Sequence, residues 1–176
     1  PDDEMAAQSA ADVAGDASNV SGVWEAHGNF DTARMEAFLK AIGCPWVFRG
    51  IFVRASKSIT QVFVTHQDDH LTFKYKVPFL GSRALDFELD GNPRTQKNLW
   101  GQTYDQVGGM EGDAVVVTCP DHPNLASGGY SQHHFRVVRE GGAEVLSWTQ
   151  RIVDPKGVGT LDSEMRFIRE GSGKGK

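Results

Sequence analysis

Apolar and polar residues alternate along most of this chain, and that alternation limits its fold more than any other feature. From Ser58 onward, runs such as residues 71–77 and 85–89 place an apolar side chain at every second position. A period of two puts these side chains on one face of a β-strand. We therefore predict an all-β fold of nine or ten antiparallel strands. Such a meander closes into an up-and-down barrel because closure removes exposed sheet edges.

Turn sequences divide the later part of the chain into separate strands. The later strands are predicted over residues 96–104, 113–119, 130–140, 144–153 and 159–169. Gly108 and Gly109 are expected to break the sheet after the first of these strands. The segment 120–129 is expected to be a loop that is longer than a hairpin needs.

One stretch, residues 21–58, interrupts the alternation near the start of the chain. After Asp31, a good helix N-cap, apolar residues recur at helical spacing: Met35, Phe38, Leu39 and Ile42. Gly43 ends this helix, and Pro45 can open a second one. A helix-turn-helix placed after the first strand of an all-β chain predicts a lid over the barrel, formed by residues 31–55.

The chain of 176 residues is long enough for one domain with a full core. Residues 1–20 are acidic and Ala-rich and offer little to bury, so they are predicted to be a flexible N-terminal arm. Residues 21–170 are predicted to form the barrel domain, followed by a flexible tail over residues 171–176. The arm is also the part that could dock the barrel onto a larger assembly.

Charge and hydropathy exclude two classes of partner. The formal net charge is −5, so the chain has no basic footprint for nucleic acid. No apolar run approaches the roughly 20 residues of a transmembrane helix. A cytoplasmic location is expected, and a removed organelle-targeting peptide is compatible with the sequence. Cys44 and Cys119 are expected to be free thiols rather than a disulfide, with Cys44 a small buried hydrophobe rather than a reactive group.

The sequence predicts no catalytic residue, no metal and no cofactor. Zinc-protease, phosphate-loop and Gly-x-Ser-x-Gly patterns are absent from it. His133 and His134 are adjacent on one predicted strand, so they point to opposite faces and cannot both ligate one internal metal. Scattered surface histidines are the preferred interpretation, with a histidine pH switch as the alternative.

Several short motifs occur in a fixed order along the chain. Gly-x-Trp-Glu opens the first strand, Asn-Phe-Asp follows it, and Met-x-x-Phe-Leu-Lys-Ala-Ile-Gly forms the first helix. With residues 57–60, 71–74 and 165–170, these motifs resemble the intracellular lipid-binding proteins, a calycin family that includes the fatty-acid-binding and cellular retinoid-binding proteins. The resemblance covers about residues 21–170, with added length near 105–132. It implies a ten-stranded barrel with a helical lid that carries fatty acids, retinoids or bile acids.

The resemblance also implies a place for the ligand head group, which the family holds with two inward arginines and a tyrosine. Arg166 falls on the arginine of the closing Arg-x-Tyr motif, and Ile168 replaces its tyrosine. Gln150 falls at the other arginine position, with Arg151 one residue away on the opposite face. The head group is therefore either a carboxylate held by Arg166 or a neutral oxygen met by Gln150. A surface position for Arg166 and an internal pair with Glu164 are the alternatives.

The more apolar face of the strand at 144–153 is expected to point inward, and it carries Leu146, Trp148, Gln150 and Ile152. Aromatic residues exceed what a filled barrel needs, so some are expected to line a cavity. The candidate ligand-binding residues are Arg166, Gln150, Trp148, Ile168, Phe38, Phe63, Phe73 and Tyr75.

These observations predict a non-enzymatic, lipid-binding transport function for a hydrophobic or amphipathic small molecule such as a fatty acid or retinoid. Two alternatives remain open. One is an enzyme on the same barrel acting on a tetrapyrrole-like substrate. The light-emitting domain of dinoflagellate luciferase resembles this architecture and uses histidines in pH gating, a role open to His122, His133 and His134. The other is an accessory subunit of a larger assembly, with a sealed barrel.

Overall fold

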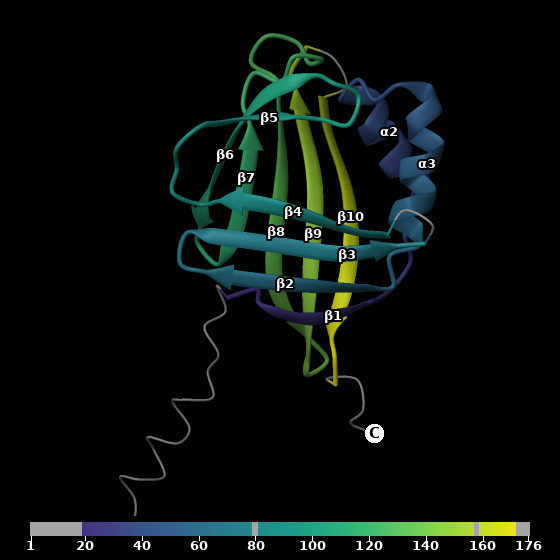
Figure 1. Cartoon of the computed structure of the whole chain (residues 1–176), viewed down its shortest axis with the longest axis vertical. Coiled ribbons are helices and arrows are strands. Elements are labelled where there is room, and N and C mark those ends of the chain that lie inside the picture. The colour runs from purple at the N-terminus through teal and green to yellow at the C-terminus, as the bar shows by residue number, and fades with distance from the viewer. Residues whose placement is uncertain (1–18, 79–80, 157–158, 172–176) are drawn as a thin grey trace, which may run out of the picture.

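The computed structural model describes residues 19–78, 81–156 and 159–171 (Figure 1). The predicted flexible arm, except for Asn19 and Val20, lies outside the described residues, and so does the predicted tail after Gly171. Val20 is fully buried in the core, so the packed domain begins before residue 21.

In the described part of the chain, ten strands form one sheet and two helices follow the first strand. The elements are β1 (Gly22–Ala26), α2 (Thr32–Ala41), α3 (Trp46–Lys57), β2 (Gln61–Gln67), β3 (His70–Val77), β4 (Gly81–Glu88), β5 (Arg94–Lys97), β6 (Thr103–Glu111), β7 (Ala114–Cys119), β8 (Tyr130–Glu140), β9 (Ala143–Asp154) and β10 (Gly159–Arg169). Neighbouring strands are antiparallel, in the order β4-β3-β2-β1-β10-β9-β8-β7-β6-β5. The predicted all-β fold with a helical pair after the first strand is confirmed.

The sheet curls so that its two halves face each other. In Figure 1, β2, β3 and β4 run across the direction of the long strands β8, β9 and β10. The helices α2 and α3 lie together beside the end where β3 finishes and β10 begins. The inward face of each half is apolar, because alternate residues of every long strand point into the space between the halves.

The two edge strands of the sheet are β4 and β5, and glycine brings the region after β4 against β6. The Gly91 amide donates to the Gly108 carbonyl oxygen at 3.0 Å. A Cβ atom at Gly108 would lie 2.1 Å from the Glu88 carbonyl oxygen. No side chain fits at position 108. The end of β4 can therefore approach β6 only because residue 108 is a glycine.

One predicted strand is wrong. Residues 96–104 do not form a single strand, because Asn98 and Gln102 close a turn between β5 and β6. The Asn98 amide donates to the Gln102 carbonyl oxygen, and the Gln102 amide donates to Asn98 Oδ1 at 2.8 Å. Strand β6 then continues through Gly108 and Gly109, which were expected to break the sheet. Glycine is compatible with a strand where another backbone comes close, as it does here.

The two helices are anchored very differently. Asp31 caps α2 as predicted, since its carboxylate accepts a hydrogen bond from the Arg34 amide at 2.9 Å. Helix α2 buries Met35, Phe38 and Leu39 against the barrel. Helix α3 has no buried residue among its 12, although half of its side chains are apolar or aromatic. The large apolar side chains that α3 leaves exposed are Trp46, Val47, Phe48 and Ile51.

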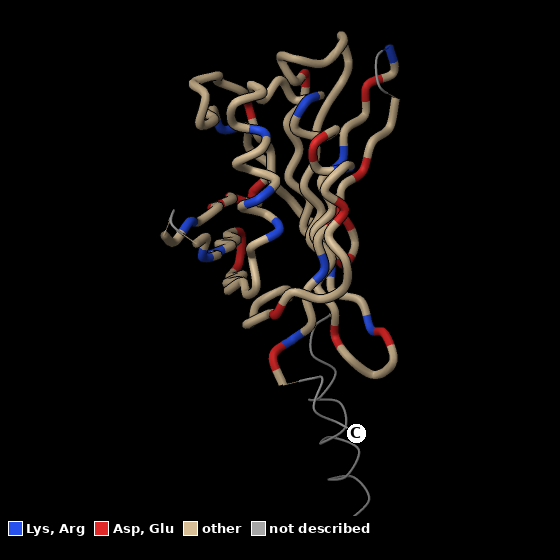
Figure 2. Tube along the Cα trace, turned by 90° about the vertical axis from the view of Figure 1, so that its right-hand side faces the viewer, with Lys and Arg blue, Asp and Glu red and all other residues tan. Residues whose placement is uncertain are grey.

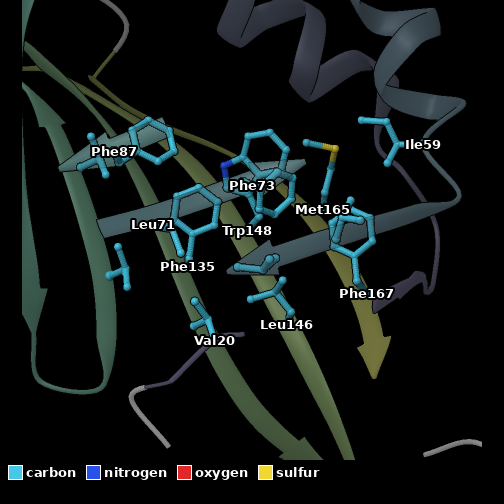
Figure 3. Close-up of a cluster of buried hydrophobic side chains, with 14 of the residues drawn as sticks. Val20, Ile59, Leu71, Phe73, Phe87, Phe135, Leu146, Trp148, Met165 and Phe167 are labelled. Atoms are coloured by element: carbon cyan, nitrogen blue, oxygen red, sulfur yellow. The ribbon is translucent and has the colours of Figure 1, made fainter. Parts of the chain in front are cut away.

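Aromatic side chains fill the middle of the barrel (Figure 3). The ring centroid of Phe73 on β3 lies 4.7 Å from that of Trp148 and 5.4 Å from that of Phe135. Phe135 and Trp148 stack at 5.6 Å. We refer to these three residues as the aromatic layer. Below it, Arg169 covers the ring of Trp24 at 4.2 Å and seals the end of the barrel opposite the helices.

The close approach at Gly108 predicts an asymmetry between two adjacent glycines. Gly108→Ala should lower the free energy of unfolding by roughly 1–3 kcal/mol, because the added methyl group forces β6 away from the Glu88 carbonyl. Gly109→Ala is the matched control, since a Cβ atom there meets nothing within 4 Å. Urea denaturation of both variants measures the difference, and equal stabilities would contradict this account of barrel closure.

Candidate functional site

The structure places most of the predicted site residues on the inner face. On β9, Leu146, Trp148, Gln150 and Ile152 are all buried, which confirms the predicted inward face of that strand. Phe38 on α2 and Phe73 on β3 are buried in the same core. Tyr75 is half-buried and continues the inner face of β3 toward the helices.

Phe63, Arg166 and Ile168 lie elsewhere. Phe63 is 48% exposed on β2, between the buried Val62 and Val64. On β10 the inner positions are held by Met165 and Phe167, so Arg166 and Ile168 point outward. These outward positions contradict the predicted ligand-binding role of all three side chains, and for Arg166 the surface alternative that the sequence left open is the one observed.

The reason for the outward position of Arg166 is the pairing of β10 with β9. Burying Met165 and Phe167 removes two large apolar side chains from water, and the period of two then turns Arg166 to the opposite face. There Arg166 bonds the carboxylate of Glu140, and its Nε atom lies 3.8 Å from Glu164 Oε1. Arg166 is therefore a surface arginine held by acidic neighbours, and an interior head group is out of its reach.

Polar residues that the sequence did not bring together form a row across the inner face. In the strand register, Gly108 pairs with Val117, Val117 with His133, His133 with Gln150, and Gln150 with Ser163. We refer to His133, Gln150 and Ser163 as the inner polar row. It lies one inward position nearer the helix-covered end than Trp148.

Some polar atoms of the inner polar row have no hydrogen-bond partner among the described residues. Trp148 Nε1 donates to His133 Nδ1 at 3.1 Å, which leaves the proton of the neutral imidazole on Nε2. Within the described residues, Gln150 Oε1 and Ser163 Oγ are buried and have no hydrogen-bond partner. A buried polar atom without a partner costs roughly 1–3 kcal/mol. Two such atoms on adjacent strands are therefore a place where a bound molecule or water would be stabilised.

A cavity of about 200 Å³ opens beside the row, between β4 and β6. Its buried walls are Phe87, Gly108 and Val117. Its outer walls are His70, Asp86, Glu88, Arg94, Gln96 and Gln106. The ring of Phe87 lies 6.0 Å from that of His133, so this cavity ends next to the inner polar row.

The row is electrically neutral near pH 7. Burial, with a smaller contribution from the neighbouring His134, lowers the pKa of His133 to about 4. On the outer face of β8 and β9, Arg136 bonds Asp113 and Arg151 bonds Asp162. Arg169 of β10 pairs instead with Glu144, at the sealed end of the barrel. Figure 2 shows that basic and acidic positions are interspersed along the chain.

An exposed arginine lies beside Tyr75, at the opening of the barrel. Arg83 on β4 pairs in register with Tyr75 on β3, and its side chain is exposed. Burial raises the pKa of the Tyr75 hydroxyl, and the charge of Arg83 opposes that rise. Arg83 therefore lies at the rim, beside Tyr75, and not in the inner polar row.

The histidines of the enzymatic alternative do not share one site. His133 faces the interior, while His134 faces outward and lies 3.0 Å from Gln132 Oε1. His122 is buried in the loop after β7 and stacks on Tyr104 at 6.3 Å. Among the described residues, no group of three or more His, Cys, Asp or Glu could hold a metal ion.

Two further sequence-based points concern the membrane and the cysteines. Within the described ranges, neither helix is long and apolar enough to cross a membrane. Cys44 and Cys119 are both free and buried. Burial raises the pKa of the Cys119 thiol to about 11, so this thiol stays protonated near neutral pH.

The inward-facing imidazole of His133 predicts a loss of stability in mild acid. The unfolded chain takes up a proton at this residue near pH 6.5, whereas the folded chain resists protonation down to about pH 4. The contribution of His133 to the free energy of unfolding is therefore complete above pH 6.5. It falls by up to about 3 kcal/mol as the pH drops to 4. Denaturation curves of His133→Gln should lack this part of the pH dependence. The exposed His27→Gln variant should retain it, and identical slopes in all three proteins would contradict the assignment.

Comparisons with known proteins bear on the fold. No family model matches the sequence, and no curated protein matches it at a significant level. Solved structures do match. The REP1-NXSQ fatty acid transporter matches with a TM-score of 0.58 and 13% identity, over 85% of this chain and 95% of that one.

Two further structures match over a similar length. Fatty-acid-binding protein 1 of Echinococcus granulosus has a TM-score of 0.58 and 12% identity, over 86% of this chain and 97% of that one. The zebrafish ileal bile acid-binding protein, solved with cholic acid, has a TM-score of 0.51 and 18% identity, over 85% and 96%. At these identities the comparison concerns the backbone arrangement alone. The chain has the curled ten-stranded sheet and helical pair of the fatty-acid-binding proteins, as its sequence motifs predicted.

Proposed function

We propose that this protein binds a hydrophobic or amphipathic small molecule inside its barrel and carries it without chemical change. The observation that carries the proposal is the incomplete packing of the helix-covered end. Apolar side chains there pack against the core but keep part of their surface accessible: Phe52 on α3, Tyr75 on β3, Leu85 on β4, Trp100 in the β5–β6 turn and Leu161 on β10. Half-buried apolar surface at the mouth of a barrel is favourable for an apolar guest.

The contacts of the two helices with the barrel would allow α3 to move away from its mouth. Asn124 Nδ2 donates to the Ile42 carbonyl oxygen at 2.7 Å and to Gln102 Oε1 at 2.8 Å. These bonds fasten the turn between α2 and α3 to the loops at the rim. Helix α3 itself buries no residue, so it can swing while α2 and the turn remain in place.

The fold comparison supports the same proposal. The matching structures include proteins named as a fatty acid transporter and as a bile acid-binding protein. A barrel of this topology can therefore enclose an apolar molecule, and the half-buried mouth of this chain offers a place for one. The aromatic layer fills the middle of this barrel, so the guest would lie between that layer and the helices.

A second candidate function is docking to a protein partner as an accessory subunit. The observation that favours it is the exposed apolar surface of α3, where Trp46 is 77% exposed and Ile51 48%. Exposed apolar side chains gathered on one helix are typical of interaction surfaces. Binding of an apolar probe inside the barrel and binding on the outside of α3 must therefore be distinguished.

Titration with the neutral fluorescent probe N-phenyl-1-naphthylamine tests the proposal. We expect one molecule per chain by native mass spectrometry. Leu161→Trp should weaken binding about tenfold or more, because the larger side chain fills the mouth of the barrel. Thr160→Trp is the matched control, since Thr160 is the exposed neighbour of Leu161 on the same strand.

Circular dichroism and urea denaturation establish that both variants are folded. Equal probe affinity in the two variants and the parent chain would place the probe outside the barrel, on a surface such as that of α3. That result, or no uptake of the probe at all, would contradict internal carriage.

A further inference from the structure

We propose that the outer face of β8, β9 and β10 carries a second binding site, which takes a small phosphorylated molecule with hydroxyl groups. The site is separate from the barrel interior, so it does not depend on the proposed carriage of an apolar guest. A cavity of about 480 Å³ lies on this face, where the three long strands run side by side (Figure 1). Its polar walls include Arg136, Ser147, Thr149, Arg151, Glu164 and Arg166.

Two arginines flank a serine across this face. In the strand register, Arg136 on β8 pairs with Ser147 on β9, and Ser147 pairs with Arg166 on β10. Neighbouring strands lie about 4.8 Å apart, so each arginine begins one strand away from the serine. Arginine side chains are long enough for the two guanidinium groups to bind one small anion above Ser147. We refer to these three residues as the outer basic row.

The arginines of the outer basic row have N–H groups that their ion pairs do not use. A guanidinium group has five N–H donors. Arg136 bonds Asp113 through Nε at 3.0 Å and Nη2 at 2.9 Å, and Arg166 bonds Glu140 through Nη2. Arg166 Nε is buried and has no hydrogen-bond partner among the described residues. A buried N–H group without a partner is costly, so an oxygen atom that reached it would be stabilised.

A carboxylate of the chain already lies at this row. Ser147 Oγ donates to Glu164 Oε1 at 2.6 Å, and the same oxygen lies 3.8 Å from Arg166 Nε. The second distance is too long for a hydrogen bond, so this carboxylate satisfies the serine but not the arginine. The Glu164 side chain is 47% exposed, so it can turn into solvent when another anion arrives. The row thus has the partners of an oxyanion site and holds a carboxylate that fits it incompletely.

A phosphate monoester fits the outer basic row better than a carboxylate does. It carries nearly two negative charges at pH 7 and has three terminal oxygens that point in different directions. These oxygens can accept hydrogen bonds from Arg136, Ser147 and Arg166 at once, whereas the two oxygens of Glu164 lie in one plane. Guanidinium groups bind phosphate through charge-assisted hydrogen bonds. The carboxylates that now bond the two arginines are exposed, and such surface pairs contribute little net stability.

The rest of the cavity indicates what the phosphate is attached to. Its volume of about 480 Å³ is far more than a bare phosphate group fills. Beside the row, His134 and Thr149 pair in register, and Arg151 follows Thr149 on the same face of β9. Burial, and then the charge of Arg151, lower the pKa of His134, so its imidazole is neutral near pH 7. Neutral imidazole, hydroxyl and guanidinium groups can bind the hydroxyl groups of a sugar, and we therefore expect a sugar phosphate.

Titration of the full chain with glucose 6-phosphate, glucose and inorganic phosphate tests the proposal. Calorimetry at pH 7.4 and low salt should show glucose 6-phosphate binding at least about tenfold more tightly than either of the other two compounds. Only this compound contacts both the outer basic row and the hydroxyl-binding groups beside it. Its affinity should fall as sodium chloride is added, because exposed charges are screened by salt.

Substitutions on this face should act in opposite directions. Arg136→Gln and Arg166→Gln should each weaken glucose 6-phosphate about tenfold or more, because each removes a cationic donor. Glu164→Gln should strengthen it about three- to tenfold, because the competing carboxylate loses its charge. Arg139→Gln and Glu25→Gln are the matched controls, since both residues are exposed and lie outside the cavity, and they should leave the affinity unchanged. Urea denaturation establishes that every variant is folded.

Three results would overturn the sugar-phosphate site. The first is a failure of glucose 6-phosphate to bind the parent chain. The second is an equal loss of affinity in Arg139→Gln and Arg166→Gln, which would show that the compound responds only to the net charge of the protein. The third is inorganic phosphate binding as tightly as glucose 6-phosphate, which would show that the sugar is not recognised.

Discussion

The long antiparallel ladder of β8, β9 and β10 determines what the interior of this protein contains. Because successive side chains of a strand point to opposite faces, the burial of Trp148, Met165 and Phe167 assigns every other residue of these strands to one side. The same pairing places His133, Gln150 and Ser163 in one inward row. It also sends Arg166 outward to Glu140. The chemistry available to a guest is thus a consequence of the register that buries the most apolar surface.

The two ends of the barrel differ in how completely their side chains are packed. At one end, Arg169 lies over Trp24 and bonds Glu144, and the carbonyl oxygen of the buried Val20 accepts a hydrogen bond from the Trp24 indole at 3.1 Å. That end is sealed by contacts among buried and half-buried groups. At the other end, α2 is buried but α3 is not, and apolar side chains keep accessible surface. Burial is therefore greater away from α3, which is the distribution that the proposed uptake of a guest requires.

Much of the fold could be predicted from local patterns. The helix cap at Asp31, the stripe of Met35, Phe38 and Leu39, and the alternation of the strands each depend on neighbouring residues, so they are visible in the sequence. The β5–β6 turn was missed because Asn98 and Gln102 close it through side-chain bonds that have no strong turn signature. The continuation of β6 through Gly108 was not predicted, because a glycine in a sequence usually indicates the end of a strand. Only the Glu88 backbone opposite shows why glycine is required there.

The features of the candidate site can also be separated into those predicted from the sequence and those decided by the tertiary structure. The sequence by itself determined the all-β architecture, the helical lid after the first strand and the inward face of β9, because periodicity and capping are local properties of the chain. Only the tertiary structure decided which polar groups meet inside. His133, Gln150 and Ser163 come from three strands, and their meeting depends on a register that is the outcome of packing the whole core. The outward position of Arg166 was decided in the same way, since the burial of Met165 and Phe167 outweighs any local preference of the arginine between them.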